Sequence, residues 1–182
     1  MASATHFLLA LLLLSFPYFF LQSSLFVSAD QELIQKTCQG TKYPDLCIST
    51  IQYDPSSSTA DKKGLAVIVL HNATATATAT YMYLSNEGAK NGTSPEFQKV
   101  IKYCTDKYGY ARNALDGSLQ DMASDQYDDA ALEASAAVEY PKSCYDEFTM
   151  RSGLTYPVEL AQREKVLEHL CEVAVGILSL LS

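Results

Sequence analysis

The chain has 182 residues, a formal net charge of −8 and a hydrophobic content of 48% without any tryptophan. This length suits one domain. Nucleic acid is excluded as an expected partner, because phosphate binding needs a basic surface. An acidic surface suits a basic protein partner, an acidic compartment or simple solubility.

Residues 7–27 are almost wholly apolar and lead into Val27-Ser28-Ala29, after which polar sequence begins at Asp30. This pattern predicts a signal peptide over residues 1–29, cleaved after Ala29. The alternative is an uncleaved membrane anchor, because the run is long enough to span a bilayer. With cleavage, we expect a secreted domain, 30–182, that has no membrane anchor and lies where disulfides persist.

The domain begins with a predicted helical hairpin over residues 30–53, formed by helices at 31–38 and 43–52 around Gly40 and Pro44. A linker over 54–58 follows. Apolar residues then recur at steps of three and four, which indicates amphipathic helices. Four such helices are predicted, at 59–85 (beginning at Thr59 or Asp61), 97–122, 125–150 and 157–181.

Two local features bear on these helices. Ser94 and Pro95 give the second long helix an N-cap and a first-turn proline. Strict Ala-Thr alternation over 73–80 could indicate a strand, but a single strand would have no partner, so we expect helix there. Short links make consecutive helices antiparallel, so the predicted fold is all-α, with an up-down-up-down four-helix bundle over 59–182.

The chain has five cysteines, which allow fifteen arrangements of two disulfides and one free thiol. Cys38 and Cys47 flank the hairpin turn and form the natural local pair. Cys104 and Cys144 lie about 20 residues either side of the turn near 124, so antiparallel helices bring them together. Cys171 then remains a buried free thiol.

Signals of catalysis or metal binding are missing. The chain has no G-x-S-x-G, H-E-x-x-H or phosphate-binding loop, so we expect neither an enzyme nor a cofactor. His71 and His169 lack ligands at metal-binding spacing, and no C-x-x-C occurs. Glycosylation sequons begin at Asn91, in a predicted loop, and at Asn72, near the apolar face of a predicted helix.

Several segments of the chain together are typical of one family of proteins. They are Thr37-Cys38-Gln39-Gly40-Thr41-Lys42-Tyr43-Pro44-Asp45-Leu46-Cys47, Asp61-Lys62-Lys63-Gly64-Leu65-Ala66, Cys104, Tyr127-Asp128-Asp129-Ala130, Ala134-Ser135-Ala136-Ala137 and Cys144-Tyr145-Asp146-Glu147-Phe148. In these residues the chain resembles the plant invertase / pectin methylesterase inhibitor family, and within it pollen members of the invertase-inhibitor type, some of them allergens. The resemblance implies a hairpin with a four-helix bundle, both disulfides and the free cysteine. It also implies a secreted or vacuolar plant protein that inhibits a carbohydrate-active enzyme by one-to-one contact.

Invertase inhibitors of this family carry Pro-Lys-Phe at the start of the third bundle helix, where this chain has residues 125–129 instead. Pro141-Lys142-Ser143 is out of register with that motif. The expected target is plant acid invertase, blocked sterically, and the alternative target is pectin methylesterase. The candidate contact residues are Asp125, Gln126, Tyr127, Asp128 and Asp129.

These aspartates would face catalytic carboxylates, so we expect stronger binding in mildly acid conditions if this end makes the contact. The plainer interpretation is that carboxylates are favoured at a helix start. A calcium site is disfavoured, because the aspartates lack EF-hand spacing and its central glycine. Two further alternatives are a secreted bundle that binds a small apolar ligand and a family member without inhibitory activity. We expect a monomer in the cell wall (apoplast), with the vacuole as the alternative location.

Overall fold

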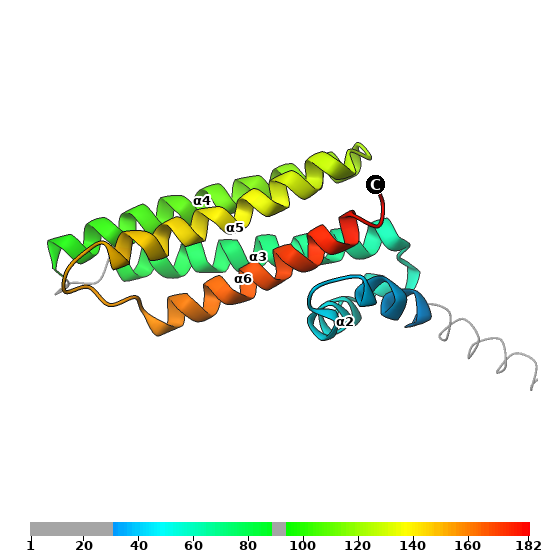
Figure 1. Cartoon of the computed structure of the whole chain (residues 1–182), viewed down its shortest axis with the longest axis horizontal. Coiled ribbons are helices and arrows are strands. Elements are labelled where there is room, and N and C mark those ends of the chain that lie inside the picture. The colour runs from blue at the N-terminus through cyan, green and yellow to red at the C-terminus, as the bar shows by residue number, and fades with distance from the viewer. Residues whose placement is uncertain (1–30, 89–93) are drawn as a thin grey trace, which may run out of the picture.

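The computed structural model describes residues 31–88 and 94–182, and the predicted signal peptide lies outside them. Every regular element in the described part is helical (Figure 1). This confirms the predicted all-α fold. After a first helix over residues 31–39, the elements are α2 (Pro44–Gln52), the 3₁₀ helix η1 (Pro55–Thr59), α3 (Lys62–Gly88), α4 (Pro95–Ala123), α5 (Tyr127–Thr149) and α6 (Val158–Leu178).

The boundaries of the long helices differ from those predicted by one to three residues, and the start of α3 and the end of α6 have identifiable local causes. The linker contains η1, which ends at Thr59, so α3 begins at Lys62 and not at Thr59. The other predicted start, Asp61, directly precedes the helix and accepts a bond from the Gly64 N–H at 2.8 Å. The last helix ends at Leu178 rather than residue 181. Beyond it the Leu180 and Leu181 N–H groups donate to the carbonyls three residues earlier, at 3.0 and 2.9 Å, so the α-helical bonding pattern gives way to a tighter turn.

Hydrogen bonds between side chains and backbone form at the start of α4 and along the Ala-Thr run of α3. The Phe97 N–H donates to the Ser94 hydroxyl at 3.2 Å, which confirms the predicted cap of α4. The Ala-Thr run is helical, and each of its threonine hydroxyls donates to the carbonyl four residues earlier. These bonds satisfy the hydroxyls within the helix, so even Thr80 is fully buried.

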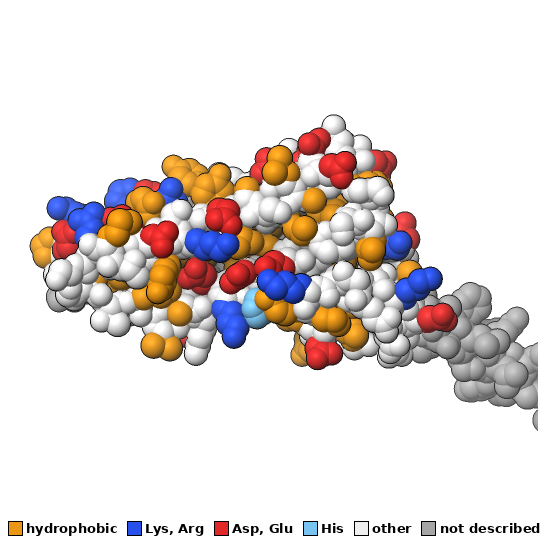
Figure 2. All heavy atoms as spheres, viewed as in Figure 1, with side chains coloured by type: hydrophobic (Ala, Val, Ile, Leu, Met, Phe, Trp, Pro, Cys, Tyr) orange, Lys and Arg blue, Asp and Glu red, His pale blue; other side chains and the backbone are white. Residues whose placement is uncertain are grey.

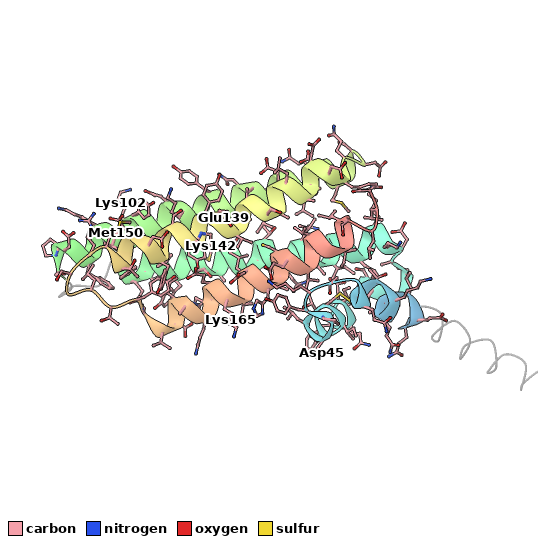
Figure 3. The ribbon with its side chains drawn as sticks, in the orientation of Figure 1. Asp45, Lys102, Glu139, Lys142, Met150 and Lys165 are labelled. Atoms are coloured by element: carbon pink, nitrogen blue, oxygen red, sulfur yellow. A yellow bond between two sulfur atoms is a disulfide. The ribbon has the colours of Figure 1, made fainter. Side chains whose placement is uncertain are left out.

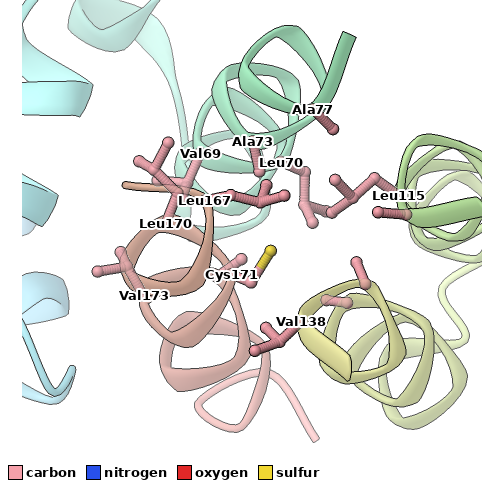
Figure 4. Close-up of a cluster of buried hydrophobic side chains, with 14 of the residues drawn as sticks. Val69, Leu70, Ala73, Ala77, Leu115, Val138, Leu167, Leu170, Cys171 and Val173 are labelled. Carbon is pink, nitrogen blue, oxygen red and sulfur yellow. The ribbon is translucent and has the colours of Figure 1, made fainter. Parts of the chain in front are cut away.

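The four long helices pack around one core. Each packs against its neighbour in the chain, and α6 closes the ring against α3. Figure 4 shows Leu70, Leu115, Val138, Leu167 and Cys171 converging from the four helices. Burial raises the pKa of the Cys171 thiol to about 12, which keeps it un-ionised and unreactive.

The hairpin lies against α3 and α6, beside the last half of α6 (Figure 1). Gly176 permits this close approach, because a Cβ there would lie 3.1 Å from the Thr41 backbone. The Lys42 ammonium pairs with the Glu172 carboxylate at 2.7 Å. The structure joins Cys38 to Cys47 and Cys104 to Cys144, the two pairs that the cysteine spacing predicts.

We predict unequal losses of stability when the disulfides are removed. Replacing Cys104 and Cys144 by alanine frees a loop of sequence separation 40, and replacing Cys38 and Cys47 frees one of 9. Chain entropy gives a loss of about 4 kcal/mol for the first pair and about 3 kcal/mol for the second. Urea unfolding of the two double variants measures this, and a larger loss for Cys38 and Cys47 would contradict it.

Candidate functional site

The turn between α4 and α5 has a fixed backbone. Asp125 has φ 58, in the left-handed region, which aspartate tolerates better than most residues. The Gln126 N–H donates to the Asp121 carbonyl at 2.9 Å and closes the end of α4. The predicted contact residues therefore start from a defined turn rather than from a loose loop.

Two side chains hold the Asp125 carboxylate from different elements. Its Oδ1 accepts a bond from Lys63 of α3 at 2.5 Å and one from the Tyr127 hydroxyl at 2.7 Å. These bonds, the Lys63 bond first, lower the pKa of Asp125. In the unbound protein this carboxylate therefore stays ionised in mildly acid conditions. Stronger binding in mild acid stays a prediction, which concerns the bound state.

The structure brings all five predicted contact residues together. Asp125, Gln126, Tyr127, Asp128 and Asp129 line one surface cavity of about 230 Å³, which Ser182 at the end of the chain also borders. Four of the five are exposed, and Tyr127 is half-buried. We call these five residues the acidic turn.

A second concave region, which the sequence reasoning missed, runs between α5 and α6. Near the hairpin, a cavity of about 350 Å³ is bordered by Glu139 and Lys142 of α5 and by Lys42 and Glu172. Figure 3 shows Glu139 and Lys142 on the side of α5 that faces α6, and Figure 2 shows charged side chains across the same region. Further along, a cavity of about 390 Å³ is lined by Tyr145, Tyr156, Ala161, Glu164, Lys165, Glu168 and His169. We call this region the α5–α6 groove.

The electrostatics differ between the two ends of the groove. Burial, the largest single effect, raises the pKa of Glu172, but the bonds from Lys42 and Tyr43 and the nearby positive charge together outweigh it, so the pKa is lowered. At the other end Glu164 accepts a bond from the Tyr156 hydroxyl at 2.5 Å. Burial first, and then the charges of Glu168 and Asp146, outweigh that bond and raise the pKa of Glu164.

A signal for the groove was present in the sequence. Glu164, Glu168 and Glu172 stand four residues apart, so they share one face of α6. Like charges at that spacing destabilise a helix unless other groups compensate them. Such a row on a bundle helix indicates a polar seam beside the apolar core.

The profile of the family described as "Plant invertase/pectin methylesterase inhibitor" matches residues 32–177. The chain belongs to this family. It is 36% identical over 146 residues to "Cell wall / vacuolar inhibitor of fructosidase 2" of Arabidopsis thaliana, covering 80% of this chain and 81% of that protein. It is 38% identical over 160 residues to "Pectinesterase inhibitor 28" of Oryza sativa subsp. japonica, covering 82% and 69%.

The crystal structure of a mutant form of a pectin methylesterase inhibitor from Arabidopsis has the same fold. It superposes with a TM-score of 0.66 at 23% identity, covering 80% of this chain and 94% of that one. Both target classes therefore occur among the relatives of this inhibitor-family chain.

The remaining predicted sites are modification and metal sites. Asn91 lies outside the described residues, while Asn72 is exposed on α3, rather than near its apolar face, and donates to the Ile68 carbonyl at 2.9 Å. Glycosylation at both stays a prediction. In the described ranges, no cluster of metal-binding side chains occurs, and no helix is both long and apolar enough to cross a membrane.

Glu164 makes a testable contribution to the dependence of stability on pH. Because its pKa is raised in the folded chain, folding favours the protonated form. That stability is fully present below the ordinary carboxyl pKa, about 4.3, and is lost as pH rises through the raised value. We predict that Glu164→Gln makes the thermal midpoint less sensitive to pH between about 4 and 7.

The matched control is Glu32→Gln, at an exposed glutamate of the first helix. It should leave the pH profile unchanged. Parallel profiles for Glu164→Gln and the unmodified chain in thermal unfolding would contradict the prediction.

Proposed function

We propose that this protein inhibits plant acid invertase (β-fructofuranosidase) by binding the enzyme one-to-one and blocking its active-site cleft. Family membership makes the chain a proteinaceous inhibitor rather than an enzyme. Its partner is therefore a carbohydrate-active enzyme. The choice of invertase is supported by the relative named as a fructosidase inhibitor, because the match covers 81% of that protein but 69% of the relative named as a pectinesterase inhibitor.

The observation that carries the proposal is the preorganisation of the acidic turn. Asp125 is held by Lys63 of α3 and by Tyr127 of α5. The turn is exposed, yet its backbone is closed by the bond from Gln126 to Asp121. A rigid protruding turn loses little conformational entropy on binding, so more of its contact energy contributes to affinity.

Pectin methylesterase is the alternative target. A relative of similar identity is named as a pectinesterase inhibitor, and Pro-Lys-Phe is missing from the start of the third bundle helix. An apolar ligand is less favoured, because the cavities of the α5–α6 groove are bordered by charged side chains.

The proposal includes the state of the protein in the plant. We propose cleavage after Ala29, a monomeric mature domain over 30–182, and glycans at Asn91 and Asn72. The relative's name includes the cell wall and the vacuole. From that name we infer an extracellular or vacuolar location for this protein, and we propose the cell wall as its site of action.

The deciding experiment titrates oxidised mature protein into plant acid invertase and, in parallel, into pectin methylesterase, at about pH 5 and pH 7. Stoichiometric inhibition of invertase supports the proposal. Inhibition of pectin methylesterase alone would replace it with the alternative target. Inhibition of neither, with helical circular dichroism intact, would overturn both.

We predict that Asp125→Asn with Asp128→Asn weakens inhibition about tenfold, equivalent to ~1.4 kcal/mol, because Asp125 loses the ion pair with Lys63 that holds the turn in its binding conformation. Since the pKa of Asp125 is lowered, the loss should be similar at pH 5 and pH 7. The matched control is Asp116→Asn, an exposed aspartate elsewhere on α4. Equal inhibition constants for the double variant and the unmodified protein would remove the acidic turn from the contact.

A further inference from the structure

The charges of α4 and the turn after it are segregated along the sequence. Residues 113–129 contain five carboxylates and no lysine or arginine. Residues 97–112 contain one carboxylate, Asp106, and four cations: Lys99, Lys102, Lys107 and Arg112. Figure 2 shows basic side chains gathered at the end of the bundle where α4 begins.

Tyrosines lie among the cations of this basic half. The Lys107 ammonium is 4.9 Å from the ring centroid of Tyr103 and 5.8 Å from that of Tyr110. The Tyr110 ring lies 5.7 Å from that of Tyr140 on α5, and Tyr110 is 51% exposed. We call Lys99, Lys102, Tyr103, Lys107, Tyr110 and Tyr140 the Tyr–Lys surface.

We propose that the Tyr–Lys surface binds an anionic polysaccharide of the uronate type. The exposed Tyr110 ring and the half-buried rings of Tyr103 and Tyr140 offer flat apolar faces for sugar rings and hydroxyls for hydrogen bonding. Lysine ammonium groups supply charge-assisted hydrogen bonds to uronate carboxylates. Tyr103, Lys107 and Tyr110 alternate ring and ammonium group along α4 at steps of four and three residues, about one turn of 5.4 Å, which suits a chain of successive sugar rings.

Charge complementarity selects this partner over other polyanions. Two of the five carboxylates of residues 113–129 lie on α4 and the other three in the acidic turn, and together they repel a long, stiff polyanion such as duplex DNA. A single flexible sugar chain can bind along the basic half of α4 alone, without approaching these carboxylates. Lys102 pairs with Asp106 at 3.2 Å, but both side chains are exposed, so this weak pair leaves Lys102 able to bind a carboxylate.

The test is calorimetric titration of the mature protein with polygalacturonate at about pH 6 and low salt. The test variant is Tyr110→Ala with Lys107→Gln. The matched control is Tyr53→Ala with Lys36→Gln, an exposed tyrosine and an exposed lysine in the hairpin. Unchanged circular dichroism and thermal midpoints show that both variants fold.

We expect the unmodified protein and the control to bind polygalacturonate, and the test variant to bind at least about tenfold more weakly. Added salt should weaken binding, because exposed charges are screened. Equal affinity of test variant and control would overturn the proposal. So would equal binding of fully methyl-esterified polymer, which lacks the charge, or of a short DNA duplex, which lacks the sugar surface.

Discussion

The antiparallel pairing of α4 and α5 is the constraint on which the rest of the molecule depends. The Cys104–Cys144 disulfide fixes the two helices near one end. Nearer the turn, the buried Ser118 hydroxyl donates to the Ala130 carbonyl at 2.8 Å. The disulfide and the hydrogen bond together set the register of α4 against α5. This one register places the residues of the acidic turn and brings the rings of Tyr110 and Tyr140 side by side.

The pairing of α5 with α6 is of a different kind. Three glutamates of α6 lie beside the core, and their mutual repulsion has to be offset. The hairpin offsets it at one end, where Lys42 pairs with Glu172. At the other end a neutral Tyr156 hydroxyl bonds to Glu164. The hairpin is therefore electrostatically coupled to the bundle as well as packed against it.

The sequence predicted those features that depend on local periodicity or on symmetry about a turn. Apolar spacing identified the long helices, and the position of Cys104 and Cys144 about the turn identified their pairing. The five residues of the acidic turn are contiguous, so any closed turn would place them together. What escaped prediction depends on pairs distant in sequence, such as Lys63 with Asp125 and Lys42 with Glu172.

Those distant pairs decide the chemistry of the candidate site. From sequence alone the aspartates of the turn look equivalent, and protonation of any of them in mild acid is a reasonable expectation. Lys63, on another helix, distinguishes Asp125 by lowering its pKa. Helix periodicity cannot reveal this pairing. It predicts on which face of α3 Lys63 lies, but it does not predict which residue of the acidic turn lies opposite Lys63.

Charge segregation along α4 also allows two surfaces to act independently. Lys107 and Asp125 are separated by 18 residues, which in a helix corresponds to about 27 Å. The screening length at physiological ionic strength is about 8 Å. A polyanion on the basic half would therefore change the field at the acidic turn very little. A polysaccharide bound at the Tyr–Lys surface would affect enzyme binding at the acidic turn by holding the inhibitor near its target. It would not act by changing the electrostatic field at the turn.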